Sequence, residues 1–232
     1  MERAATRTPV DPTADARPLD VRWLGQVPYQ DALDLQASLV VERRANSVPD
    51  QLVFLEHPHV ITMGSSSSEG HVLLGPEELR ERGIQLFEVG RGGDVTYHGP
   101  GQLVGYPVLD LKPDRTDLHR YLRDLEDVLI GALGAFGLRG EREPGFTGVW
   151  VGGAKIAAIG VRVSSGWITS HGFALNVSTD LEFFGTVVPC GITDRRMTSL
   201  EKELGRPPGP DEVRRAVVRS FADVFDRAIV TN

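Results

Sequence analysis

The sequence contains very little cysteine and very little lysine. Cys190 is the only cysteine among 232 residues, and Lys112, Lys155 and Lys202 are the only lysines among 25 lysine and arginine residues. One cysteine excludes an internal disulfide and a multi-cysteine zinc site. A free thiol survives in a reducing compartment, and we therefore expect the chain to be cytoplasmic.

Other absences narrow the function classes further. No run approaches the roughly 18 apolar residues of a membrane span. The first 20 residues lack the apolar core of a secretory signal. The net charge of −7 argues against general binding to nucleic acid or anionic membranes. We therefore expect no nucleic-acid partner and no membrane partner. The histidines show no metal-ligand spacing, so we also expect no bound metal.

The pattern of apolar residues predicts one α+β domain. Residues 1–18 are rich in Pro, Ala, Asp and Arg without periodicity, and we expect a disordered tail followed by a single domain over 19–232. Strand-like and helical segments follow in an irregular order. This order predicts a mixed, largely antiparallel sheet flanked by helices. Helices are expected over 30–46, 76–83, 117–136, 194–204 and 210–228. Strands are expected over 21–29, 51–57, 59–64, 84–90, 102–111, 147–151, 155–163 and 167–177.

Cys190 and Lys155 are the first candidates for chemistry. Cys190 lies between Pro189 and Gly191, in a sequence suited to a bend, and Lys155 lies within the apolar run GAKIAAIGVRV. An ammonium about 4 Å from a thiolate contributes roughly 4 kcal/mol at an effective dielectric near 20, and this attraction lowers the pKa of the thiol. Each residue also has an ordinary interpretation, as a buried inert thiol and as an exposed lysine at a hairpin end.

Two further segments combine small residues with polar side chains. RGGDVTYHGPGQ (91–102) has four glycines that permit close backbone approach to a ligand, and its free N–H groups suit an oxyanion, with His98 as a second candidate donor. SHGFALNVSTDL (170–181) has small residues that leave room for an acyl chain. Taken alone, these segments are also compatible with a glycine-rich turn and with ordinary core packing. The segment 91–102 does not match either of the usual phosphate-binding glycine motifs.

Together the four segments RGGDVTYHGPGQ, GAKIAAIGVRV, HGFALNVSTDL and PCGITDRRMTSL resemble the octanoyltransferase family of lipoate biosynthesis, in the family's order. The resemblance covers roughly residues 20–228. It implies a fold of the biotin/lipoate protein ligase type. It also implies that Cys190 is the acyl-thioester nucleophile and that Lys155 is its activating partner. The substrate-binding residues that it implies are Arg91, Gly92, Gly93, Asp94, Val95, Thr96, Tyr97, His98, Ala158, Ile159, Gly160, Gly172, Phe173 and Ala174.

The resemblance also implies a reaction and its partners. The donor would be octanoyl-acyl carrier protein, and the acceptors would be lysines on the lipoyl domains of 2-oxoacid dehydrogenase E2 subunits and on the glycine cleavage H protein. A thioester donor is already activated, so no cofactor, ATP or magnesium is expected. Because acyl carrier protein is generally acidic, we expect a local basic patch, with Arg195 and Arg196 as the first candidates and Arg43 and Arg44 as weaker ones.

Two other functions remain open at this point. An ATP-dependent lipoate or biotin ligase of the same fold would activate a free acid as an adenylate and would not require the cysteine. A non-enzymatic binding module would use Cys190 as a core residue or a redox sensor. The pairing of Cys190 with Lys155 argues against the ligase, and alkylation of Cys190 with the profile of a low-pKa thiol would argue against the binding module.

Overall fold

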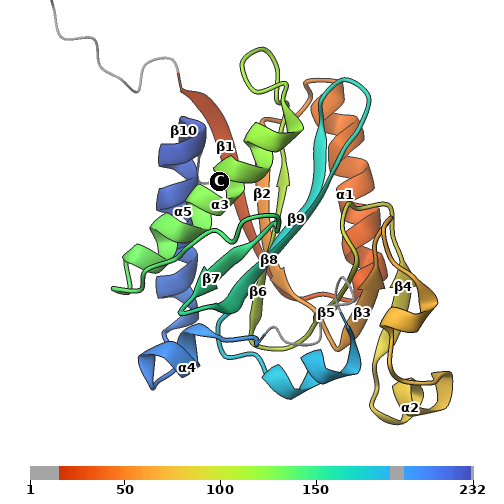
Figure 1. Ribbon diagram of the computed structural model, residues 1–232. Coiled ribbons are helices and arrows are strands. Elements are labelled where there is room, and N and C mark those ends of the chain that lie inside the picture. Colours follow the sequence, from red (N-terminus) through yellow and green to blue (C-terminus); the bar gives the residue numbers. More distant parts are fainter. Residues whose placement is uncertain (1–15, 189–195, 231–232) are drawn as a thin grey trace, which may run out of the picture.

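The computed structural model of the chain describes residues 16–188 and 196–230. Within these residues, the larger of two sheets has seven strands in the order β10-β1-β2-β6-β9-β8-β7 (Figure 1). The strand β1 is parallel to β10 and β2, whereas the other neighbouring pairs are antiparallel. The sheet is therefore mixed and largely antiparallel, as the sequence predicts. Its strands are β1 (Arg17–Gln26), β2 (Asp50–Glu56), β6 (Gln102–Val108), β7 (Val149–Val151), β8 (Ala154–Val163), β9 (Thr169–Asn176) and β10 (Arg227–Val230).

A second, smaller sheet lies beside the first, on the right in Figure 1. Its order is β4-β3-β5, with β3 (Val60–Met63), β4 (Gln85–Glu88) and β5 (Val95–His98). A short 3₁₀ turn (Glu69–His71) and the helix α2 (Pro76–Glu81) connect β3 to β4, which run parallel. The sequence pattern did not predict this second sheet or the strand β5, which follows directly on the glycines of the loop before it.

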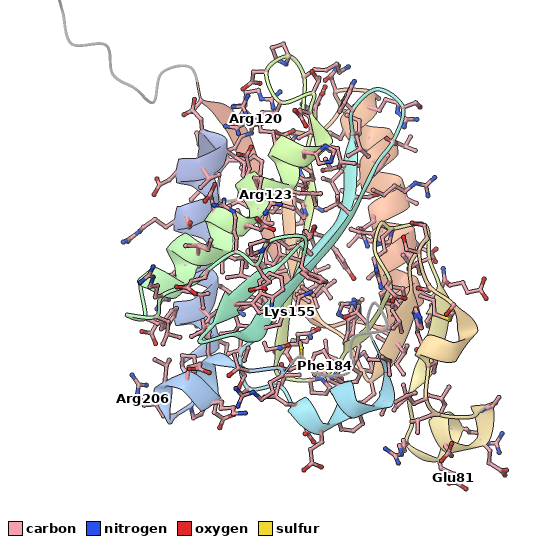
Figure 2. The ribbon with its side chains drawn as sticks, viewed as in Figure 1. Glu81, Arg120, Arg123, Lys155, Phe184 and Arg206 are labelled. Carbon is pink, nitrogen blue, oxygen red and sulfur yellow. The ribbon has the colours of Figure 1, made fainter. Side chains whose placement is uncertain are left out.

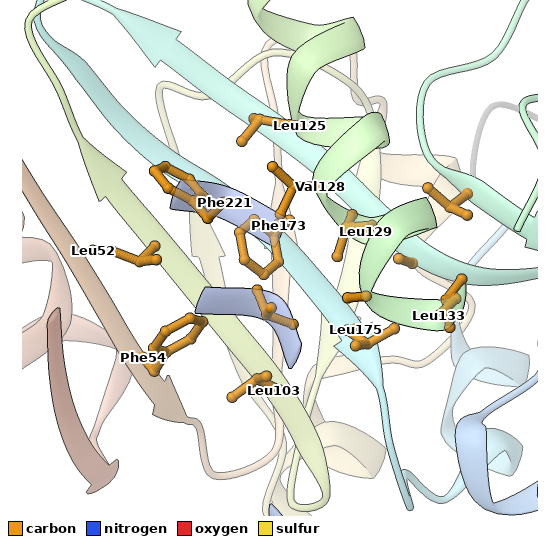
Figure 3. Close-up of a cluster of buried hydrophobic side chains, with 14 of the residues drawn as sticks. Leu52, Phe54, Leu103, Leu125, Val128, Leu129, Leu133, Phe173, Leu175 and Phe221 are labelled. Carbon is orange, nitrogen blue, oxygen red and sulfur yellow. The ribbon is translucent and has the colours of Figure 1, made fainter. Parts of the chain in front are cut away.

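Helices cover both faces of the larger sheet. Helix α1 (Tyr29–Arg44) packs Ala32 and Leu39 against one face, where Val53 and Tyr106 are buried. Helices α3 (Leu118–Gly134) and α5 (Pro210–Phe225) cover the other face. Figure 3 shows this side of the core, where side chains from α3 meet the sheet. The labelled side chains are Leu52, Phe54, Leu103, Leu125, Val128, Leu129, Leu133, Phe173, Leu175 and Phe221.

The local sequence determines where helix α3 begins and which of its faces packs on the core. The Asp117 carboxylate accepts hydrogen bonds from the backbone N–H groups of His119 and Arg120, which caps the first turn. Apolar residues at helical spacing then face the core, although Leu118, the first residue of the helix, is 42% exposed. The helix begins and ends within two residues of its predicted bounds.

Other boundaries differ from the prediction. The strand β1 begins at Arg17, two residues before the predicted start of the domain at residue 19. The helix α4 spans only Leu200–Leu204, and the chain after α5 forms β10, where the prediction continued the helix to 228. A short 3₁₀ helix (Leu181–Thr186) lies before the segment 189–195. Asp226 adopts a left-handed conformation and ends α5, so that Arg227 pairs with Arg17 across the sheet.

Arg43 does not belong to a surface patch, which corrects one expectation. Its side chain is 11% exposed, and its Nε atom lies 2.7 Å from the Asp50 carboxylate. Arg227 approaches the same carboxylate at 2.8 Å. Asp50 thus joins α1, β2 and β10, and Arg43 is not available to a docking partner. Arg44 is exposed and donates a hydrogen bond to the Ser164 hydroxyl.

Candidate active site

A cavity of about 760 Å³ is lined by residues from both sheets. Its central part is apolar, with Val104 on β6, Ala158 on β8 and Ala174 on β9 side by side in register. Small residues in this row leave space above the sheet, because larger side chains would fill it. The volume and the apolar lining suit an aliphatic group.

Lys155 stands at the start of β8 and lines this cavity. Its backbone pairs with the segment around Met197, because its N–H donates to the Arg196 carbonyl and its carbonyl accepts from the Thr198 N–H, each at 2.9 Å. The Lys155 ammonium lies 5.2 Å from the centre of the Trp150 ring. Phe184, labelled with Lys155 in Figure 2, belongs to the same lining. The structure thus places the Lys155 ammonium on the cavity wall beside the aromatic ring of Trp150.

Gly148 makes room for the Lys155 side chain. A Cβ atom at Gly148 would lie 2.7 Å from Lys155 Cε and 2.6 Å from the Ala157 carbonyl oxygen, and the φ of +139° is unfavourable for other residues. The Gly148 N–H donates to the Glu126 carboxylate at 3.1 Å. This carboxylate is fully buried on α3 and also accepts from Arg123 and Arg142. Helix α3 therefore positions the loop that packs on Lys155.

The loop before β5 is organised by the Arg91 side chain. Its guanidinium donates to the carbonyls of Thr62, Gly92 and Asp94 and to the Thr62 hydroxyl. The Gly92 N–H donates to the Val161 carbonyl at 2.9 Å, which fixes the loop against β8. Arg91 therefore holds the loop as well as lining the cavity, and its guanidinium faces carbonyls of its own chain.

Hydrogen bonds determine the tautomer of His98. The Asn176 amide must donate to the Thr198 carbonyl, so its oxygen accepts from the Gln102 amide. The Gln102 oxygen then faces His98 Nδ1 at 2.7 Å, and this nitrogen carries the proton. Consequently His98 Nε2 has a lone pair and accepts hydrogen bonds. This finding argues against the expectation that His98 donates to an oxyanion.

Hydrogen bonds also determine the tautomer of His57. His57 Nδ1 donates to the Val27 carbonyl at 2.7 Å, so its Nε2 accepts from the Tyr106 hydroxyl at 2.8 Å. Burial lowers the pKa of His57 to about 4 and of His98 to about 3, and His57 itself further lowers the pKa of His98. Burial and the nearby Arg91 lower the pKa of His171 to about 4. All three rings are neutral at physiological pH.

Tyrosines complete this end of the cavity. Burial raises the pKa of Tyr29 to about 12, and burial also raises the pKa of Tyr106. The Tyr29 ring lies 5.0 Å from the His57 ring and 6.3 Å from the His98 ring. Both hydroxyls therefore stay protonated, and the region is polar without titrating near neutral pH.

Comparisons with known proteins place the chain in a family. Residues 28–222 match the lipoyl protein ligase A/B catalytic domain. An octanoyltransferase from Rubrobacter xylanophilus is 54% identical over 209 residues, which is 89% of this chain and 94% of that relative. An octanoyltransferase from Chloroflexus aurantiacus is 48% identical over 211 residues, 90% of this chain and 95% of that relative. The chain belongs to the octanoyltransferase family.

The fold agrees with solved structures at lower identity. A lipoate-protein ligase A bound with ATP superimposes with a TM-score of 0.71 at 20% identity, covering 92% of this chain and 89% of that one. This chain and that ligase thus share the architecture described above, and the expected biotin/lipoate ligase type of fold is confirmed. As a member of this family, the chain is an acyltransferase.

The structure gathers most of the residues that the family resemblance implies. Twelve of the fourteen implied binding residues line the cavity, together with Lys155; the two exceptions are Gly92 and Tyr97. Gly92 fixes the loop to β8, as described. The Tyr97 hydroxyl hydrogen-bonds to His59 Nδ1 at 2.7 Å, and its ring stacks on Phe183. These two residues therefore support the lining from behind, within the smaller sheet and its neighbours.

Cys190 lies outside the described residues, as do its neighbours Pro189, Gly191 and Arg195. The predicted meeting of the Cys190 sulfur with the Lys155 nitrogen therefore stays a prediction. Val188 and Arg196, which flank this segment, both line the cavity.

Sequence reasoning did not identify several residues that line the cavity. They include Tyr29 on α1, Tyr106 on β6 and Phe146 in the loop before β7. Only the last had a local signal, since the run PGFTG around Phe146 is typical of a loop with close backbone approach. Among the described residues, no group of three or more His, Cys, Asp or Glu side chains is arranged to hold a metal ion. No helix in the same part of the chain is long and apolar enough to cross a membrane.

Proposed function

We propose that this octanoyltransferase moves the octanoyl group from octanoyl-acyl carrier protein to a lysine of a lipoyl domain, through a thioester on Cys190. The observation that supports the proposal is the placement of Lys155 on the wall of a cavity of about 760 Å³ whose middle is apolar. An ammonium at this position stabilises a nearby thiolate and an acyl oxyanion. Val188, two residues before Cys190, lines the same cavity.

In the first half of the proposed reaction, the Cys190 thiolate attacks the carbonyl carbon of the donor thioester. A carbon–sulfur bond forms to Cys190, the bond between the carbonyl carbon and the carrier sulfur breaks, and the carrier leaves as a thiol with a proton from the Lys155 ammonium, which becomes a neutral amine. The acyl chain then lies along the row formed by Val104, Ala158 and Ala174. Apolar burial at this row holds the chain.

In the second half, the amine of the acceptor lysine attacks the acyl-cysteine. An amide bond forms, the bond to Cys190 breaks, and the amine loses a proton. Lys155 is the described group at this wall that is best placed to exchange that proton with solvent. His98 is unsuitable as the base, because a group with a pKa of about 3 is too weak at neutral pH.

The decisive experiment is intact-mass analysis after mixing the protein with octanoyl-acyl carrier protein. We expect one octanoyl adduct that hydroxylamine removes, and none on the Cys190→Ser variant. The Lys155→Met variant should form the adduct at least about a hundredfold more slowly, as expected for loss of an activating group. Transfer from free octanoate and ATP by the Cys190→Ser variant would instead favour a ligase and contradict the proposal.

A further inference from the structure

The cavity has an apolar middle and a polar end. The polar end is formed by Tyr29, Arg91, His98, Tyr106 and His171, all of which line the cavity. Tyr106 and Tyr29 both interact electrostatically with Arg91, as do His98 and His171. An acyl chain that ends in a methyl group offers these side chains no hydrogen bond.

Strand β8 places this polar end at a distance from Lys155. Gly160 follows Lys155 by five positions on β8, about 16 Å along an extended strand. A Cβ atom at Gly160 would lie 3.1 Å from Arg91 Cδ and 3.0 Å from the Gly92 carbonyl oxygen. Arg91 and its loop therefore close the cavity at the level of Gly160.

An extended octanoyl chain fits the apolar middle. Its seven carbon–carbon bonds of about 1.5 Å, arranged in a zigzag, span about 9 Å. A chain whose carbonyl lies at the level of Lys155 thus ends near Ala158, before the polar end. A dodecanoyl chain is about 5 Å longer and would bring its last methylenes against Tyr29 and Arg91.

Three side chains at the polar end can form hydrogen bonds that the described residues do not provide. The Tyr29 hydroxyl makes no hydrogen bond to another described residue, and neither does His98 Nε2 or the His171 ring. Water molecules satisfy such groups when they have space, and a longer alkyl chain would displace that water.

We propose that this polar end sets the upper limit on acyl-chain length, because a chain beyond eight to ten carbons must leave its hydrogen-bonding groups unsatisfied. Each added methylene favours binding by about fourfold through burial. One buried polar group left without a partner disfavours it by about five- to 150-fold. The penalty therefore exceeds the gain once the chain reaches Tyr29 and its neighbours. This inference rests on the proposed function, since it assumes an acyl chain in the cavity.

The test compares acyl transfer from hexanoyl, octanoyl, decanoyl and dodecanoyl pantetheine thioesters. The Tyr29→Phe variant removes one hydroxyl without leaving a described partner unpaired. We expect it to raise the kcat/KM ratio of dodecanoyl over octanoyl by about five- to tenfold. The Gly160→Ala variant should act the other way and lower the kcat/KM of dodecanoyl relative to octanoyl, because its methyl group enters the cavity beside Arg91, beyond the end of an octanoyl chain.

The matched control is Tyr121→Phe, which makes the same chemical change at a tyrosine buried outside the cavity, against Phe225. Its chain-length profile should equal that of the wild type. An unchanged profile in an active Tyr29→Phe variant, or an equal shift in Tyr121→Phe, would overturn the inference. Failure of the wild type to transfer any of the four acyl groups would instead overturn the proposed function.

Discussion

At the residue scale, the position of the Lys155 side chain depends on a residue without a side chain. Alanine at Gly148 would place its methyl group 2.7 Å from Lys155 Cε, so the lysine must move. We expect Gly148→Ala to reduce octanoyl transfer by at least about tenfold and to lower the free energy of unfolding by about 1–3 kcal/mol through backbone strain. Steady-state transfer rates and urea unfolding measure the two effects.

Gly137 offers the control for this substitution. It has a φ of +73° in the turn after α3, and a Cβ atom there would contact nothing within 4 Å. The Gly137→Ala variant should therefore lose comparable stability and keep its transfer rate. A Gly148→Ala variant with normal kinetics would show that the position of Lys155 is unimportant for the reaction.

The buried histidines predict a loss of stability in acid. His57, His98 and His171 are neutral in the folded chain, with pKa values of about 4, 3 and 4, whereas an unfolded histidine binds a proton near pH 6.5. The unfolded state therefore binds more protons below pH 6.5, and the free energy of unfolding falls as the pH decreases toward 4. Each histidine contributes about 2 kcal/mol to the decrease between pH 7 and pH 5.

Urea unfolding at pH 7 and pH 5 measures this difference. The His57→Gln variant should reduce it by about 2 kcal/mol, because one titrating group is gone. His119 is exposed on α3, and the His119→Gln variant should leave the difference unchanged. A pH dependence that is the same in the wild type and in His57→Gln would contradict the assignment.

The sequence predicts the place of some residues in the site and not of others. Lys155 and the glycines of 91–102 are recognisable, since small residues around a polar one form a local pattern. Tyr29 and Tyr106 are far apart in the sequence and look like ordinary apolar positions, and only the packing of α1 on the sheet brings them together. Arg43 shows the opposite error, because a basic residue near a helix end suggests a surface position, whereas Asp50 at the start of β2 binds it in the interior together with the distant Arg227.

At the scale of elements, α3 supports the site from behind through Glu126. Its carboxylate is fully buried and accepts hydrogen bonds from Arg123, Arg142 and the Gly148 N–H. We expect Glu126→Gln to lower the free energy of unfolding by about 2–4 kcal/mol, since one of its acceptors becomes a donor facing other donors. The transfer rate should also fall, because the loop at Gly148 loses its anchor.

Asp127, the next residue on α3, provides the comparison. It pairs with Arg142 at 2.6 Å, and its side chain is 50% exposed. The Asp127→Asn variant should change stability by less than about 1 kcal/mol, as for other exposed pairs. Thermal unfolding and transfer assays on both variants separate a buried anchor from a surface ion pair; equal effects would contradict the role of Glu126.

Elements with strong local signals were predictable. Helix α3 has a capping aspartate and a regular apolar face, and β8 and β9 have long apolar runs. The strands β5 and β10 have only four residues each, and they form because a neighbouring strand offers hydrogen bonds. Such pairing depends on residues distant in sequence, so propensity alone suggested a turn at β5 and a continued helix at β10.

At the scale of the whole molecule, charge predicts how the acyl donor docks. The chain carries a net charge of −7, yet Arg196 and Lys202 line the cavity, and Arg206 projects from the same end in Figure 2. Reversing Arg196 and Lys202 to Glu should raise the KM for octanoyl-acyl carrier protein, the donor that we propose, by about tenfold or more, because we expect that carrier to be acidic. The KM for octanoyl pantetheine should change far less.

Arg139 is the control for charge reversal. Its side chain is 90% exposed and pairs with Glu141, outside the cavity lining. The Arg139→Glu variant should keep both KM values, and the effect of the double reversal should weaken as salt is added. An equal increase in KM for the carrier-bound and the small substrate would show that these residues do not contact the carrier.

The cavity draws its walls from two sheets, with β5 on one side and β6, β8 and β9 on the other. A bound acyl chain is then an apolar bridge between two separately hydrogen-bonded units. Occupancy should reduce local opening of the smaller unit, and the amide protons of Val95–His98 should exchange with deuterium more slowly once the enzyme carries its acyl group. Amides within α5, which does not line the cavity, should exchange at the same rate in both states. Amide exchange in the smaller sheet would thereby distinguish the acylated enzyme from the free enzyme.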